Sequence, residues 1–191
     1  MISRITYLRE LRHELLHYKG DALKEFYYLE SEDLRYKNEP GKWSIIEIFE
    51  HLNLTNQFYI QALSKALGKA EQAETDNFSH GWLGKKAIKM MRPNSEGNIL
   101  KIPTLGKIDP RKYQKQGRVL VNQVVFQDFI DGLESLITLA EEMEPKAIDK
   151  KSIRTLVPFI RLSMGDALAF ITAHTHRHIE QARQLANELQ H

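Results

Sequence analysis

The sequence predicts an all-α protein in which residues 1–191 form a single domain, a four-helix bundle. Four long segments carry apolar residues at helical spacing, and turn residues separate them. No segment shows a convincing alternating pattern of a half-buried strand. A chain of 191 residues can bury one sizeable core, and long amphipathic helices bury their apolar faces against one another.

We expect the first helix over residues 3–29. Its apolar residues recur at helical spacing along one stripe: Leu8, Leu11, Leu15, Ala22, Phe26 and Leu29. His13 and His17 lie four residues apart on this helix, roughly opposite the stripe. We interpret both as exposed surface residues, and they serve as an internal control for histidines elsewhere.

The second helix is expected to begin after Pro40-Gly41 and to end at Gly68. Ser44 is placed to cap its first turn, and Glu47, three residues later, completes a capping box. His51 lies beside the apolar face of this helix. On its own, a histidine in that position is ordinarily a surface residue.

Residues 69–117 lose the helical pattern, apart from a short helix expected over residues 83–91. Residues 85–118 contain ten lysines and arginines against two acidic residues, a net charge of +8, whereas the whole chain carries +2. This long basic insertion between the second and third helices suits either a solvated loop or a surface that attracts an anionic ligand. Nucleic acid is not favoured as a partner, because no recognised binding motif accompanies the charge.

The third helix is expected over residues 118–143 and the fourth over residues 162–189, with a linker at residues 153–159. On the fourth helix, His178 falls inside the apolar stripe and His174 lies at its margin, whereas His176 and Arg177 point away. Burying an unpaired imidazole is unfavourable. His178 therefore needs a metal ion, a hydrogen-bond partner or a water molecule.

Two histidines four residues apart on a helix can reach one metal ion. Helical bundles build such sites from inward side chains of facing helices, so His51, His174 and His178 would form a reasonable three-histidine site. The chain contains no cysteine, which excludes thiolate ligands, disulfides and a cysteine nucleophile. It shows no signal-peptide pattern and no apolar run near the ~20 residues of a membrane span, so we expect a cytoplasmic protein without a membrane partner.

Residues 42–52 resemble the second-helix motif of the DinB/YfiT-like superfamily, with Trp43-Ser44 near the start and His51-Leu52 two turns later. Residues 162–166 and 174–181 resemble its fourth-helix motif, in which an arginine precedes and a glutamine follows the second histidine. The resemblance covers essentially the whole chain. It implies an up-down-down-up four-helix bundle, often a homodimer, that holds zinc or nickel through His51, His174 and His178.

The superfamily includes thiol S-transferases that use bacillithiol or mycothiol. The first hypothesis is therefore a metal-dependent transferase in which a low-molecular-weight thiol cosubstrate attacks a small, electrophilic substrate, and the basic insertion would suit an anionic thiol. Gln181 could orient His174 or His178 from outside the ligand set.

Two alternatives remain open. Other members are described as metal-dependent hydrolases, in which metal-bound hydroxide is the nucleophile and Glu47 would be a candidate catalytic base besides its role in helix capping. The third hypothesis is a non-catalytic stress-response or binding protein. Its basic segment would contact an acidic partner, and its histidines would be hydrogen-bonded and free of metal.

Overall fold

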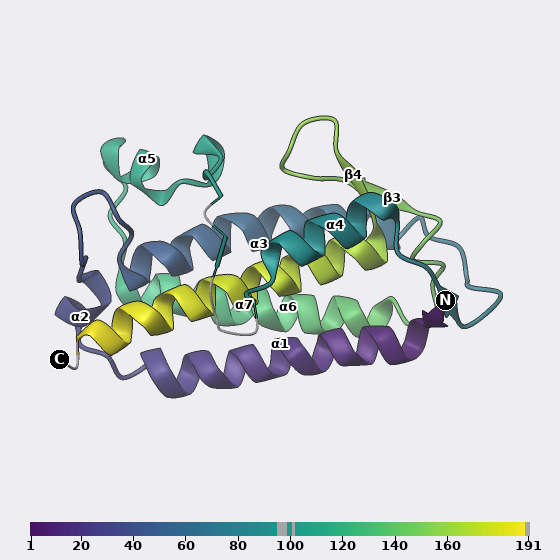
Figure 1. The fold of residues 1–191 in the computed structure, drawn as a ribbon, viewed down its shortest axis with the longest axis horizontal. Helices are drawn as coiled ribbons and strands as arrows, with labels where there is room; N and C mark the ends of the chain where they lie inside the picture. Colours follow the sequence, from purple (N-terminus) through teal and green to yellow (C-terminus); the bar gives the residue numbers. More distant parts are fainter. Residues whose placement is uncertain (95–98, 101, 190–191) are drawn as a thin grey trace.

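Four long helices form the body of the molecule in a computed structural model, which describes residues 1–94, 99–100 and 102–189 (Figure 1). They are α1 (Arg4–Phe26), α3 (Ile45–Leu67), α6 (Asn122–Glu142) and α7 (Met164–Glu188). α3 packs on α6 and α7, and α1 packs on the same two helices. α1 and α7 run in one direction, and α3 and α6 run in the opposite one (Figure 1). The chain is thus mostly helical, as expected.

Three of the long helices begin at a serine that caps them. Ser3 Oγ accepts a hydrogen bond from the backbone of Thr6, and Ser163 Oγ accepts one from the backbone of Asp166. Ser44 caps α3 in the predicted capping box with Glu47. These serines satisfy backbone N–H groups that have no partner within the helix. The caps fix where the helices start.

Several predicted boundaries need correction. The first helix ends at Phe26, and a separate short helix, α2 (Ser31–Arg35), follows it. The third helix begins four residues later than expected, at Asn122, because residues 118–121 connect it to the preceding element. The fourth begins at Met164, because Leu162 and Ser163 belong to a strand.

The expectation of no strands is wrong at two places. β1 (Ile2–Ser3) pairs antiparallel with β2 (Asn77–Phe78), and β3 (Ser152–Arg154) pairs antiparallel with β4 (Arg161–Ser163). The expected linker at residues 153–159 is therefore part of a hairpin, with Phe159 exposed and at a positive φ of 65°. Strands of two or three residues are too short to show an alternating pattern, which explains why the sequence missed them.

The described part of the basic insertion contains more regular structure than its sequence suggests. It contains α4 (Trp82–Met91), close to the short helix expected there, a single 3-10 turn η1 (Gly106–Ile108), and α5 (Pro110–Lys115). α4 packs on α7, whereas η1 and α5 pack on α3 (Figure 1). The described part of the insertion therefore covers the side of the molecule where α3 and α7 meet.

Several cations of this insertion are already paired. Arg92 contacts Glu14 at 2.9 Å, Arg118 contacts Glu50 at 2.9 Å, and Arg111 contacts Asp109 at 2.7 Å. Lys101 and Glu96 lie outside the described residues. The net charge of the segment therefore overstates the charge that it presents to a ligand.

No helix in the described part of the chain has the length and apolar character needed to cross a membrane.

Candidate metal centre

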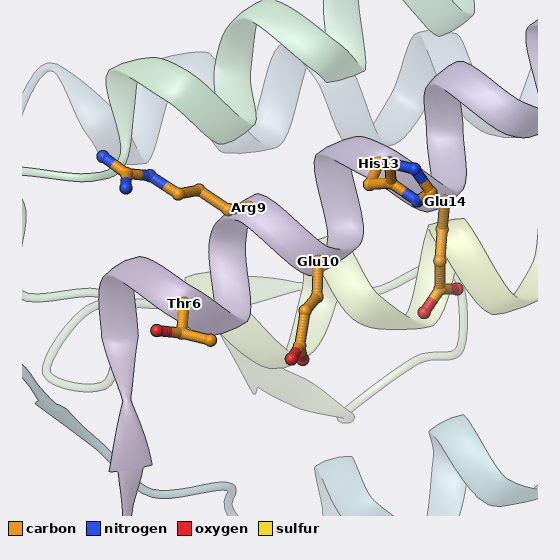
Figure 2. Close-up of a pocket in the computed structure, with 5 residues that line it drawn as sticks. All are labelled: Thr6, Arg9, Glu10, His13 and Glu14. Atoms are coloured by element: carbon orange, nitrogen blue, oxygen red, sulfur yellow. The ribbon is translucent and has the colours of Figure 1, made fainter.

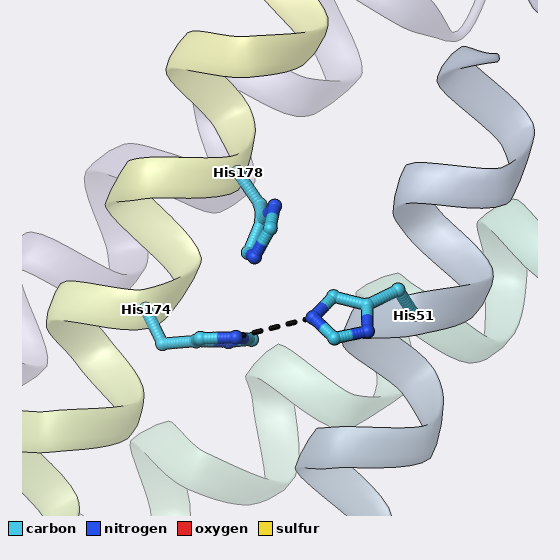
Figure 3. A group of neighbouring side chains, drawn as sticks. All are labelled: His51, His174 and His178. Atoms are coloured by element: carbon cyan, nitrogen blue, oxygen red, sulfur yellow. Dashed lines mark hydrogen bonds between the residues drawn. The ribbon is translucent and has the colours of Figure 1, made fainter. Parts of the chain in front are cut away.

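Three histidines from two helices meet inside the molecule. His51 comes from the second turn of α3, and His174 and His178 come from successive turns of α7. One ring nitrogen of each lies within 4.8 Å of a nitrogen of the other two, and the residues are only 3–7% exposed. Figure 3 shows the rings facing a common space between α3 and α7. The structure therefore brings these three histidines together, as predicted.

Hydrogen bonds fix the orientation of two of the rings. His51 Nδ1 lies 2.8 Å from the carbonyl oxygen of Ile108 in η1. Because a carbonyl only accepts, Nδ1 carries the proton and Nε2 keeps its lone pair. His178 Nδ1 likewise donates to Gln181 Oε1 at 2.9 Å. Both rings therefore present a lone pair on Nε2.

His174 completes the cluster without a comparable partner. Its Nε2 lies 3.2 Å from Nε2 of His51, and its Nδ1 has no hydrogen-bond partner among the described residues. Two arrangements account for this distance: a neutral His174 that donates its Nε2 proton to Nε2 of His51, or a metal ion that both nitrogens bind. The imidazole nitrogen of a neutral histidine is a preferred ligand of zinc and nickel.

Burial keeps all three imidazoles in the neutral form. Removal from water lowers the pKa of His51 to about 4 and lowers the pKa values of His174 and His178 well below their usual range. The nearby charge of Arg177 acts in the same direction on all three. The imidazoles are neutral near pH 7, the form that binds metals. These three histidines could therefore hold a divalent metal ion.

A cavity of about 840 Å³ adjoins the histidines. Most of its wall is apolar, with contributions from α3, α7, the β3–β4 hairpin and the insertion: Trp43, Tyr59, Met91, Leu105, Leu156 and Phe170. The polar lining includes Arg111, Arg177 and Gln181. Glu188 is the single carboxylate among the described lining residues. Such a mostly apolar hollow with a few polar groups is typical of a small-molecule site.

Glu47 lies close in sequence to the cluster but does not line the cavity. Its carboxylate accepts a hydrogen bond from the backbone of Ser44 at 2.9 Å and contacts Lys37 Nζ at 2.7 Å. The residue is 1% exposed. Helix capping and the ion pair with Lys37 therefore account for the position of the Glu47 side chain.

Two residues of α7 next to the histidines differ from expectation. Arg177, predicted to point away from the core, is 6% exposed and lines the cavity. His176 is half-buried and stacks on Tyr18, with ring centroids 5.1 Å apart. Both predictions assumed that α7 buries a single face. They failed because α7 packs on α1 and α3 and also on α4.

The segment around Ile108 and Arg111 that covers His51 was not predicted from the sequence. The group that orients His51 is the backbone carbonyl of Ile108, and no side-chain pattern in the sequence indicates such a contact. Trp43 packs against His51, with ring centroids 4.7 Å apart, and Arg111 lies 5.8 Å over the Trp43 ring. Arg111 also donates to the carbonyl of Gly41 at 2.7 Å. These contacts tie the insertion to the start of α3 beside the cluster.

The histidines of α1 belong to a different environment. His13 and His17 are both exposed, as predicted. His13 borders an open surface hollow with Thr6, Arg9, Glu10 and Glu14 (Figure 2). These side chains project from α1 in different directions and do not converge on a common point (Figure 2). The spacing of four residues therefore does not by itself make a site.

Fold and site define a helical protein with a buried histidine cluster suited to a divalent metal. A family model of the DinB superfamily matches residues 8–182. The chain belongs to the DinB superfamily. Searches of curated proteins and of solved structures each found no match.

Proposed function

We propose that the protein is a metal-dependent thiol S-transferase, built as a single-domain up-down-down-up four-helix bundle. Zinc or nickel would bind His51, His174 and His178, with Gln181 orienting His178. The observation that carries this proposal is the convergence of three buried imidazoles at a cavity with mostly apolar walls. Its cosubstrate would be a low-molecular-weight thiol of the bacillithiol type.

The metal ion, the thiol and the residues of the cavity wall would have separate roles in the reaction. A divalent ion bound by three neutral imidazoles keeps its charge and would supply Lewis acidity that favours the thiolate form of a thiol near neutral pH. Because the chain has no cysteine, that thiol must come from a cosubstrate. Trp43, Tyr59 and Phe170 would bind the electrophile and exclude water from it.

The lining residues favour a thiol over water as the nucleophile. A metal ion can generate hydroxide by itself, but a general base within hydrogen-bond reach of the attacking water would assist hydrolysis. Glu47 is engaged by Ser44 and Lys37, and Glu188, the carboxylate that does line the cavity, contacts Asn38 at 3.3 Å near the end of α7. A thiolate attacks an electrophile without such a base.

The test measures conjugation of a thiol to monochlorobimane, a fluorogenic electrophile. We expect turnover that requires both the metal and the added thiol, with bacillithiol and cysteine as the thiols compared. His178→Ala should lose this turnover, and His13→Ala, at an exposed position on α1, should keep it. Equal rates in wild type and His178→Ala would refute the proposal.

The same preparation separates the alternatives. Thiol-independent ester hydrolysis that Glu47→Gln abolishes would favour the hydrolase. Protein that contains no metal and binds an acidic partner in a salt-sensitive manner would favour the binding protein.

A further inference from the structure

Arg177 is a buried cation with no balancing anion among the residues that the structure describes. Its side chain lies on α7 between His174 and His178 and lines the cavity. One guanidinium nitrogen, Nη2, donates to the backbone carbonyl of Leu100. The other, Nη1, is buried and has no hydrogen-bond partner among the described residues. Arg177 also takes part in no ion pair with any described residue, although the residue is only 6% exposed.

A buried guanidinium of this kind destabilises the folded protein when no ligand is bound. A charged group removed from water is destabilising unless a counter-charge or hydrogen bonds compensate it. The neighbouring histidines are neutral ligands, so a divalent ion bound there would add positive charge to the same cavity. A ligand that brings a negative charge to Arg177 would offset this cost.

Arg111, the other arginine in the wall, does not have the same capacity. Its guanidinium forms two hydrogen bonds with the carboxylate of Asp109, at 2.9 and 2.7 Å, and a third with the carbonyl of Gly41. Its charge is therefore already balanced. The two arginines therefore differ: Arg111 is neutralised by Asp109, whereas Arg177 has no acidic partner within the described residues.

We propose that the guanidinium group of Arg177 binds the carboxylate of a small-molecule ligand in this cavity. A monoanion matches the single uncompensated charge, and the apolar walls suit an aromatic or aliphatic body for that ligand. That the ligand is the thiol cosubstrate or the electrophile of the transferase rests on the proposed function. The anion-binding role of Arg177 does not.

The test compares benzoate with benzamide, which has nearly the same shape and no charge. Binding of each to the full-length protein as purified is measured by calorimetry or ligand-observed NMR. We expect wild type to bind benzoate about tenfold or more tightly, the range of a charge-assisted hydrogen bond in a buried site. Arg177→Gln should lose this preference, Arg177→Lys should keep part of it, and Arg9→Gln, at an exposed arginine of α1, should keep it in full.

A metal-free control separates Arg177 from the metal. Benzoate could also coordinate a metal ion, so chelator-treated wild type, shown to be metal-free by elemental analysis, is expected to retain the preference. Equal binding of benzoate and benzamide by wild type would overturn the inference, as would a preference that survives in Arg177→Gln or disappears in the metal-free protein. A transferase assay without thiol-dependent turnover, with the benzoate preference intact, would remove the proposed function and leave the Arg177 site.

Discussion

Gln181→Leu should weaken metal binding without removing a ligand. Gln181 Oε1 accepts the Nδ1 proton of His178 at 2.9 Å, which holds the ring so that Nε2 faces the other two histidines. Loss of such an outer partner typically lowers metal affinity 10–100-fold. Gln181 is half-buried, so water can partly replace it, and we expect a change near the lower end, about tenfold or about 1.4 kcal/mol.

The assay is competition for zinc with a chromogenic chelator, performed on wild type and variant at the same pH. Gln57→Leu is the matched control, because Gln57 is exposed on α3 and should leave the affinity unchanged. The thermal midpoint of the metal-free proteins shows whether Gln181→Leu alters the fold. An unchanged zinc affinity in a folded Gln181→Leu variant would show that this hydrogen bond does not position His178.

Three further predictions follow from burial. His13→Ala should leave the metal content unchanged by elemental analysis, since that side chain is exposed; loss of metal would place His13 in the site. Gly84→Ala should lower the thermal midpoint, because the added Cβ would lie 2.2 Å from Cγ of Asp166. Gly20→Ala, whose added Cβ would meet nothing within 4 Å, should instead stabilise the protein by up to about 1 kcal/mol through higher helix propensity. The chelator-treated protein should lose stability as the pH falls below about 6.5, by up to about 1.4 kcal/mol per pH unit for each buried histidine. The sign follows because the unfolded chain then binds protons, whereas burial lowers the pKa of His51 to about 4 in the folded state; a midpoint that rises on acidification would contradict it.

Periodicity located the four long helices because each buries a continuous stripe of apolar side chains. The same reasoning separated the two histidine pairs, since His13 and His17 face away from the stripe and His178 falls within it. It was weaker for His51, which lies beside the apolar face of α3 yet is 3% exposed. The insertion covers that side of α3, and its docking leaves no periodic signal.

The rest of the site depends on contacts between distant segments. The ring of His51 is oriented by a backbone carbonyl 57 residues away, which no side-chain pattern encodes. Arg177 was expected at the surface because a helical wheel identifies one buried face, whereas α7 packs on three other helices. The two small sheets likewise depend on pairing of short segments, such as Ile2 with Phe78. Local sequence determines the elements, and tertiary packing determines which polar groups are enclosed.

The most direct test of the central claim is the metal content of protein purified without a polyhistidine tag. Wild type should carry about one zinc or nickel ion per chain, as expected for a single three-histidine site. His178→Ala should carry far less while keeping its helical circular dichroism spectrum. Equal metal content in the two proteins, or none in wild type grown with both metals supplied, would contradict the assignment of His51, His174 and His178 as a metal centre.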